Sequence, residues 1–206
     1  MAEVWAGVDE AGRGPVVGPL VMAWVQVDTA RVSELVALGV RDSKCLSRAQ
    51  RERLFPRIIR ECLQWDVVCL LPIALDRFSI ARLQLTTLIE WVRLYRPDRV
   101  TVDALGPRNA IPRWLRDIRT AIPDWRGVCR MFPGADREDP VVAAASILAK
   151  VIRDRAIVWL RERYGDFGWG YPSERKTRQF LQEWYRQHGR WPVWVRQKWR
   201  TCRKVI

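Results

Sequence analysis

Two patterns of hydrophobic and polar residues alternate along the chain. Short runs of apolar, β-branched and aromatic residues predict strands, which cover residues 4–8, 20–27, 65–71, 99–102 and 127–132. Longer segments with apolar residues three and four positions apart predict helices, which cover residues 47–63, 80–95, 111–122, 139–164 and 173–189. We expect the strand at 65–71 to be buried. Strands and helices therefore alternate through the first two-thirds of the chain, and helices dominate its end.

Local signals place several helix ends. Ser47 is a candidate N-cap for the first long helix, and we expect Pro56 to kink or split that helix. Asp139 followed by Pro140 is typical of an N-cap and the first helical position. The small residues after Pro140 would let this helix pack close to a sheet. Gly189 marks the end of the last long helix.

The alternation predicts an α/β fold in which helices flank a central sheet. Only a glycine-rich turn separates the first two strands. We therefore expect these strands to pair antiparallel and the sheet to be mixed. No repeat, low-complexity tract or linker interrupts this order.

The charge of the chain indicates a partner. The sequence has 36 lysines and arginines against 23 aspartates and glutamates, a formal net charge of +13. Such an excess suits a polyanion, either nucleic acid or an anionic membrane surface, although a basic enzyme without a polyanionic substrate would also have it. No basic amphipathic segment stands apart from the predicted fold, which disfavours the membrane. Nucleic acid is the preferred interpretation.

The five cysteines are scattered and odd in number, and no two form a Cys-x-x-Cys pair. They predict neither a zinc site nor a disulfide framework. A reducing compartment is expected, so we predict a cytoplasmic protein. We see no signal peptide, and the longest uncharged run, residues 14–27, is too short to span a bilayer.

Four acidic residues lie at the ends of predicted strands or in the turns beside them; these are Asp9, Glu10, Asp103 and Asp136. Each alone can be an ordinary surface carboxylate or turn residue. However, Asp9 and Asp103 each follow an apolar strand, and such strand ends collect ligands in α/β sheets. Asp136 precedes a helix, from where it can point back at the sheet. Asp9 and Glu10 face opposite sides of a regular strand, so both reach one site only if the backbone bends at Glu10.

Four carboxylates in one site repel one another, and hard divalent cations relieve that repulsion. Ligand sets made of oxygen atoms select Mg²⁺ or Mn²⁺. The single histidine, His188, is expected to be a surface or C-cap residue. Without a histidine base, water activated by two metal ions is the natural nucleophile for a phosphodiester. The four acids therefore predict a two-metal centre.

Gly12-Arg13-Gly14 directly follows the first acidic pair. A lone Gly-x-Gly is also what a tight turn requires. In a basic protein, the backbone N–H and C=O groups of such a loop can approach a substrate closely. They can read a ribose 2′-hydroxyl, the group that separates RNA from DNA.

Several motifs together resemble the type 2 ribonucleases H, and within them the ribonuclease HII family. The motifs are Asp9-Glu10-Ala11-Gly12-Arg13-Gly14-Pro15, Asp42-Ser43-Lys44, Val102-Asp103-Ala104-Leu105, Ala135-Asp136, the run 144–151, and Gly170-Tyr171-Pro172-Ser173. They follow the order and spacing of that family. The end of the chain, from Gly168 through Trp199-Arg200-Thr201, is similar to archaeal members.

The resemblance implies a ribonuclease H-like fold. It implies a catalytic core over residues 1–165 and a helical, substrate-binding extension over 166–206, both in one compact unit. The implied ligands of two Mg²⁺ or Mn²⁺ ions are Asp9, Glu10, Asp103 and Asp136. The residues implied to bind substrate are Gly12, Arg13 and Gly14 at the 2′-hydroxyl of an RNA–DNA junction, Tyr171 against the sugar of the next deoxynucleotide, and Lys44 near the backbone.

The implied activity is cleavage of the RNA strand of RNA–DNA hybrids and incision 5′ to single ribonucleotides in duplex DNA. Hydrolysis of this kind leaves 5′-phosphate and 3′-hydroxyl ends. The implied partners are RNA–DNA hybrid and ribonucleotide-containing duplex DNA, and the expected state is a monomer. The expected biological role is removal of misincorporated ribonucleotides and RNA primers.

Two alternatives remain open at this point. A ribonuclease HIII-like enzyme that cleaves only hybrids shares the motifs, but normally has an added N-terminal domain, for which a first strand at Val4 leaves no room. A non-catalytic hybrid-binding module would be favoured by the loss of a carboxylate, and all four are present. Segment 78–84 lacks the asparagines common in the family, so a substrate contact there is lost or replaced by Ser79, Arg82 or Gln84. Asp154 is interpreted as a helix-surface or structural residue.

Overall fold

A mixed sheet of five strands forms the centre of the protein in the computed structural model, which describes residues 3–40 and 46–204. The strand order is β3-β2-β1-β4-β5. The strands are β1 (Val4–Ala11), β2 (Leu20–Asp28), β3 (Gln64–Leu70), β4 (Arg99–Asp103) and β5 (Val128–Phe132). Strand β2 pairs antiparallel with β1 and β3, whereas β1, β4 and β5 run parallel. The predicted antiparallel opening pair and the mixed α/β sheet are confirmed.

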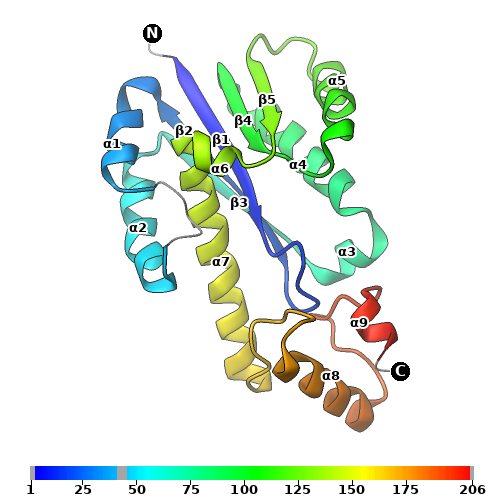
Figure 1. Cartoon of the computed structure of the whole chain (residues 1–206). Coiled ribbons are helices and arrows are strands. Elements are labelled where there is room, and N and C mark those ends of the chain that lie inside the picture. The colour runs from blue at the N-terminus through cyan, green and yellow to red at the C-terminus, as the bar shows by residue number, and fades with distance from the viewer. Residues whose placement is uncertain (1–2, 41–45, 205–206) are drawn as a thin grey trace.

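Helices cover both faces of this sheet (Figure 1). One face carries α1 (Val32–Ala37), α2 (Arg48–Glu61) and α7 (Pro140–Tyr164). The other face carries α3 (Pro72–Arg77), α4 (Ile80–Tyr95) and α5 (Ile111–Ala121). The remaining helices are α6 (Ala135–Glu138), which leads into α7, α8 (Arg175–His188), α9 (Arg200–Arg203), and the 3₁₀ turns η1 (Thr29–Arg31) and η2 (Arg108–Ala110).

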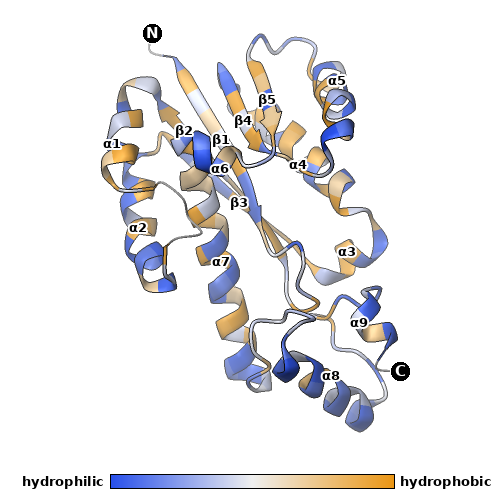
Figure 2. Cartoon of the chain, in the orientation of Figure 1, coloured by the Kyte–Doolittle hydropathy of each residue, from blue (hydrophilic) through white to orange (hydrophobic). Residues whose placement is uncertain are grey.

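Strand β2 shows why the molecule has two hydrophobic layers. Its side chains alternate between the faces of the sheet. Val21 and Val25 pack in the cluster that contains α7, and Met22 and Trp24 pack in the cluster that contains α4 and α5. Burial on both sides explains the continuous apolar run in the sequence. Hydrophobic residues run along the strands, and the helices contain both hydrophobic and hydrophilic residues (Figure 2).

Helix α7 packs closely on β1 because both elements have small residues at the contact. Its buried residues include Ala143, Ala144 and Ala145. A Cβ atom on Gly7 of β1 would lie 2.3 Å from the backbone carbonyl carbon of Val141. The side chain of Asp139 accepts a hydrogen bond from the N–H of Val141 at 2.9 Å, which confirms the predicted N-cap. The helix therefore begins at a fixed place over the sheet.

Helix α2 is continuous, so the split expected at Pro56 is wrong. The predicted N-cap is confirmed, because Ser47 Oγ accepts from the N–H of Gln50 at 3.3 Å and the Gln50 side chain accepts from the N–H of Ser47 at 2.7 Å. Leu54 and Ile58, on either side of Pro56, are buried against the core. Their packing offsets the one backbone hydrogen bond that proline removes.

Three other predictions need correction. Strand β3 is at the edge of the sheet and is mostly half-buried, whereas the apolar run at 65–71 suggested full burial. The last long helix begins at Arg175 and not at Ser173, although Gly189 ends it as predicted, with φ +64°. Four short helices were not predicted; these are α1, α3, α6 and α9. A helix of fewer than two turns is too short for the helical spacing of apolar residues to show in the sequence.

The chain after α7 returns to the loop between β1 and β2. Val17 and Val195 form an antiparallel bridge, and the N–H of Val16 donates to the carbonyl of Gly170 at 2.8 Å. Val16 and Val17 share a hydrophobic cluster with Leu181 of α8. The described part of the C-terminal segment therefore packs on this loop, and its designation as a substrate-binding extension stays a prediction.

Candidate metal and nucleic-acid site

The parallel pairing of β1 and β4 places two of the predicted carboxylates side by side. Val8 lies beside Val102, so the next residues, Asp9 and Asp103, are neighbours at the carboxyl ends of the two strands. Val8 and Val102 face the core that contains α4 and α5. Asp9 and Asp103 therefore face the opposite side of the sheet, which α7 covers. Helix α6 adds Asp136 to the same edge.

The three aspartates form a tight cluster. One carboxylate oxygen from each of Asp9, Asp103 and Asp136 lies within 4.8 Å of the other two. Asp9 is 5% exposed and Asp136 is 1% exposed. Backbone groups orient Asp103, because its Oδ1 accepts from the N–H of Gly134 at 2.7 Å and from that of Ala135 at 3.3 Å. These bonds tie the start of α6 to the end of β4.

Burial raises the pKa of the Asp9 carboxyl to about 6. The positive charge of Lys150, whose Nζ lies 3.9 Å from Asp9 Oδ2, and a hydrogen bond from Ser146 act in the other direction. The negative charge of Asp103 adds to the increase. The Asp9 carboxyl therefore holds its proton more tightly than an ordinary aspartate does.

Glu10 lies on the opposite face of β1. The strand stays regular through Ala11, which pairs with Val21, so the bend expected at Glu10 is wrong. Glu10 is outside the group of three aspartates. Burial, and after it the charge of Asp9, raise the pKa of its carboxyl to about 7, and Arg13 Nε donates to Glu10 Oε1 at 3.1 Å.

All four predicted acids nevertheless line one cavity of about 410 Å³. Its other lining residues are Ala11, Gly12, Arg13, Arg51, Lys150, Arg153, Asp154 and Tyr171. The structure thus brings Gly12, Arg13 and Tyr171, three of the predicted substrate-binding residues, together with the acids. Gly14 is not among the lining residues, and Lys44 lies outside the described residues.

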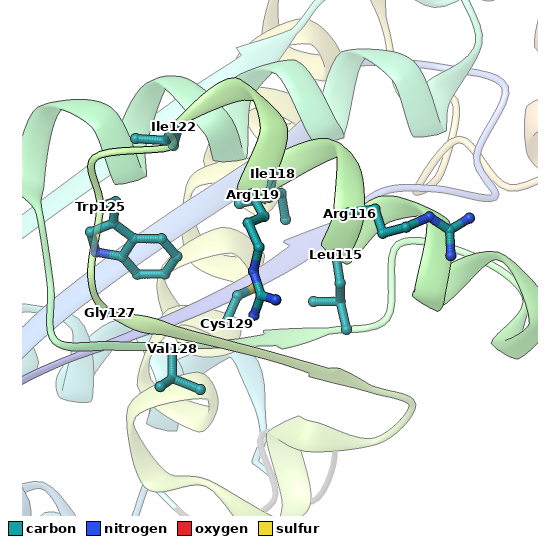
Figure 3. A pocket seen from close by; sticks show the side chains of 9 residues that line it. All are labelled: Leu115, Arg116, Ile118, Arg119, Ile122, Trp125, Gly127, Val128 and Cys129. Atoms are coloured by element: carbon teal, nitrogen blue, oxygen red, sulfur yellow. The ribbon is translucent and has the colours of Figure 1, made fainter.

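A second cavity, of about 310 Å³, lies between α5, β5 and the turn that joins them (Figure 3). Arg116, Arg119 and Trp125 line it together with apolar side chains, and no described carboxylate does. Val128 and Cys129 are the first residues of β5. Asp103 is the last residue of β4, so it lies at the opposite end of this parallel pair of strands. This cavity gathers none of the predicted site residues.

In the Gly12-Arg13-Gly14 segment after β1, the structure requires glycine at the first position. Gly12 has φ +91°, and a Cβ there would lie 2.7 Å from the carbonyl oxygen of Pro19 and 2.9 Å from the Arg153 side chain. Glycine alone tolerates both the dihedral angle and the close approach. At Gly14 no atom lies within 4 Å of such a Cβ. The packing of the described residues therefore does not explain why position 14 is a glycine. The open space beside it suits a position that a substrate approaches.

Arg13 contacts the helix on the other face of the sheet. Its guanidinium donates to Gln84 Oε1 of α4 at 2.7 Å and to the backbone carbonyl of Leu105. Gln84 is fully buried. Ser79 caps α4, because its Oγ accepts from the N–H of Arg82 at 3.3 Å. Of the three residues considered as replacements for the missing asparagines, Gln84 is the one that contacts the Gly12–Gly14 loop.

Tyr171 lies at the rim of the cavity with 40% of its surface exposed. The N–H groups of Tyr171 and Trp169 both donate to Glu174 Oε2, at 3.0 and 2.8 Å. The Arg153 guanidinium lies 5.3 Å from the Tyr171 ring centroid and donates to the carbonyl of Trp169 at 2.8 Å. The Arg153 guanidinium thus lies near the Tyr171 ring, and the residue as a whole remains exposed.

Four cavity residues were not assigned to the site from the sequence; these are Arg51, Lys150, Arg153 and Asp154. Asp154 is buried and accepts from Arg51 at 3.1 Å and from Arg48 at 3.3 Å. Asp154 is therefore a buried ion-pair residue, which fits the structural role expected as one alternative and not the helix-surface position expected as the other. Arginines are so frequent in this chain that the sequence does not show which positively charged side chains lie beside the acids.

The donor atoms of the cluster suit a hard divalent cation. They are carboxylate oxygens, and no described cysteine or histidine belongs to the group. Negative charges this close in a buried site repel one another. Mg²⁺ and Mn²⁺ both take oxygen ligands. The residues present therefore fit such a cation.

The family model for Ribonuclease HII matches residues 6–202. The chain belongs to the ribonuclease HII family. This family consists of hydrolytic endonucleases, which confirms the predicted family and enzyme class. Ribonuclease HII of Pyrococcus abyssi is 40% identical over 204 residues, which cover 97% of this chain and 90% of that protein.

Two solved structures of the ribonuclease HII family have the same fold. The ribonuclease H2 from Pyrococcus horikoshii has a TM-score of 0.91 and 36% identity, over 98% of this chain and 96% of that chain. The ribonuclease HII of Archaeoglobus fulgidus, solved in a complex with PCNA, has a TM-score of 0.86 and 37% identity, over 98% and 96%. The predicted ribonuclease H-like fold and the archaeal character of the sequence are confirmed. None of the helices within residues 3–40 and 46–204 is long and apolar enough to cross a membrane.

Proposed function

We propose that this family member cleaves the RNA strand of RNA–DNA hybrids and incises duplex DNA 5′ to single ribonucleotides. The observation that carries the proposal is the buried group of Asp9, Asp103 and Asp136, whose oxygens lie within 4.8 Å of one another. This group lines the same cavity as Gly12, Arg13 and Tyr171. The residues that we propose hold the metal ions and the loop that we propose reads the ribose therefore line one cavity.

Asp9, Asp103 and Asp136 would hold two divalent cations, Mg²⁺ or Mn²⁺, and Glu10 would contribute from the opposite face of β1, because it lines the same cavity. A bound divalent cation supplies activation of water and stabilisation of charge on the phosphate oxygens. The protein keeps the carboxylates in place through the backbone bonds to Asp103 and the packing of β1 on α7. Hydrolysis leaves a 5′-phosphate and a 3′-hydroxyl.

The Gly12–Gly14 loop contributes recognition of the 2′-hydroxyl, and Tyr171 contributes a surface for the sugar of the next deoxynucleotide. Lys44 and the arginines of the cavity bind phosphates in a salt-sensitive way. We further propose that the enzyme is cytoplasmic, as the unpaired cysteine pattern suggests, and that it acts as a monomer. Its role is the removal of misincorporated ribonucleotides and RNA primers.

A cleavage assay tests this function. The substrates are a DNA duplex with one ribonucleotide, a long RNA–DNA hybrid and an all-DNA duplex, each in Mg²⁺ and in Mn²⁺. We expect incision 5′ to the single ribonucleotide, cleavage of the hybrid and no cleavage of DNA. Cleavage of the long hybrid alone would shift the specificity to the ribonuclease HIII type. Tight hybrid binding without cleavage in either metal would favour the non-catalytic module.

A further inference from the structure

A buried arginine from the end of the chain holds the Gly12–Gly14 loop. Arg196 is 0% exposed, yet no described carboxylate pairs with it. Its guanidinium donates to three backbone carbonyls: Gly12 at 2.6 Å, Arg13 at 3.0 Å and Gly18 at 3.1 Å. Two of the three acceptors belong to the loop that we propose reads the ribose.

Burial of the charged Arg196 guanidinium costs free energy. Burial, and after it the neighbouring charge of Arg153, lower the pKa of Arg196 to about 9. The residue still carries its charge at neutral pH, so all of its donors are present. A buried cation without an anionic partner is unfavourable unless its hydrogen bonds are satisfied. The three carbonyls and the charge of Asp76 offset this cost, so burial of the guanidinium depends on the conformation of the loop.

The bonds to Arg196 fix the direction of two backbone N–H groups. In a trans peptide unit the C=O of one residue and the N–H of the next point in opposite directions. Because the carbonyls of Gly12 and Arg13 point inward to Arg196, the N–H groups of Arg13 and Gly14 point away from it. Neither N–H has a hydrogen-bond acceptor among the described residues. The loop that follows Asp9 and Glu10 thus presents two unsatisfied donors together.

The backbone around Arg196 is itself anchored. The N–H of Arg196 donates to the carbonyl of Val16 at 2.9 Å, and the N–H of Gly18 donates to that of Trp194 at 2.9 Å. Its guanidinium lies 5.0 Å from the ring centroid of Trp199. These backbone hydrogen bonds fix the position of Arg196, so its side chain reaches the loop in one orientation.

We propose that Arg196 is a positioning residue that sets the selectivity for ribose, by turning the N–H groups of Arg13 and Gly14 toward the 2′-hydroxyl of the substrate. This inference rests on the proposed function. Lysine keeps the positive charge but has a single nitrogen, which cannot bridge three carbonyls with the geometry of a planar guanidinium. The substitution Arg196→Lys should therefore release the loop without changing the charge.

The test measures binding in a chain that carries Asp136→Asn, so that substrate is not consumed. Affinities are measured for a DNA duplex with one ribonucleotide and for the all-DNA duplex of the same sequence. We expect Arg196→Lys to lower the preference for the ribonucleotide by about tenfold, the equivalent of one hydrogen bond, with the affinity for DNA unchanged. Arg93→Lys is the matched control, because Arg93 also donates to a backbone carbonyl, that of Ala121, at 3.2 Å.

The outcomes separate the inference from the function on which it rests. An unchanged preference in Arg196→Lys would overturn the inference, and so would an equal loss of affinity for both duplexes, which indicates a general structural role. If the parent chain shows no preference and the wild type does not incise, the proposed function fails as well.

A second measurement does not depend on the folding of a variant. Amide hydrogen exchange of Arg13 and Gly14 should be fast in the free protein and slow when the ribonucleotide-containing duplex is bound. The all-DNA duplex should protect these two amides less. Absence of added protection from the ribonucleotide duplex would overturn the inference.

Discussion

At the scale of single residues, the acids of the site are distinguished by how they are held. Backbone N–H groups donate to both Asp103 and Asp9, and Asp9 and Asp136 are in addition almost fully buried. A neutral side chain of the same shape can occupy such an enclosed position without loss of packing. Charge and shape can therefore be tested separately.

Asp136→Asn should lower the rate of cleavage by about a thousandfold or more, which corresponds to the several kcal/mol that a bound cation supplies at the transition state. Binding of RNA–DNA hybrid should be largely retained, because phosphate contacts come from other residues. Single-turnover cleavage and equilibrium binding measure the two effects. An equal loss of both would contradict the role proposed for Asp136.

The sequence identified the acids better than it identified the cations around them. Asp9 and Asp103 could be predicted because each follows an apolar run, and the carboxyl ends of parallel strands meet at one edge. Their shared face depends on the register of β1 with β4, which no local signal specifies. Arg153 and Arg196 could not be predicted, because an arginine in a basic segment has the same local pattern whether it lies on the surface or under a loop.

At the scale of elements, the contact between β1 and α7 determines where Asp9 lies. Gly7→Ala would place a Cβ 2.3 Å from the backbone of Val141, so the strand and the helix must separate. We expect the free energy of unfolding to fall by about 1–3 kcal/mol, as for other overpacked positions. Gly14→Ala is the control, since a Cβ there has no neighbour within 4 Å, and it should change stability by less than about 1 kcal/mol. Denaturant unfolding measures both variants, and similar losses would contradict this account of the contact.

The long elements were predictable from pattern, and the short ones were not. Ser47, Asp139 and Gly189 mark helix ends in the sequence and in the structure. The split predicted at Pro56 is wrong, because the packing of Leu54 and Ile58 in the core outweighs the tendency of proline to interrupt a helix. An apolar run also does not reveal whether a strand is central, as β2 is, or at an edge, as β3 is.

At the scale of the whole molecule, the net charge of +13 should govern affinity for nucleic acid. Binding to RNA–DNA hybrid releases counterions, so the logarithm of the affinity should fall linearly with the logarithm of salt concentration. Titrations of the Asp136→Asn variant at several salt concentrations measure the slope. A slope near zero would contradict binding through phosphate contacts.

The buried acids should also make stability depend on pH and on metal. Without metal, Asp9 and Glu10 have pKa values of about 6 and about 7, above the ordinary 3.8 and 4.5. The folded state binds these protons more tightly than the unfolded chain, so their contribution to the free energy of unfolding rises as pH falls from about 8 to about 5. Asp9→Asn should remove part of this dependence.

Mn²⁺ competes with these protons, since it requires ionised carboxylates. It should therefore raise the melting temperature more at pH 8 than at pH 5. Thermal unfolding of the wild type and of Asp9→Asn, with and without Mn²⁺, measures both effects. A shift of equal size at the two pH values would contradict metal binding by the raised-pKa carboxylates.

The bond between Arg196 and the carbonyl of Gly12 joins residues 184 positions apart. During translation the loop and the first carboxylates are therefore made long before the arginine that holds the loop. A growing or prematurely terminated chain can contain every acid of the metal cluster and still lack the contact that orients the loop. In the order of synthesis, the contact that orients the loop can therefore form only after every acid of the metal cluster has been made.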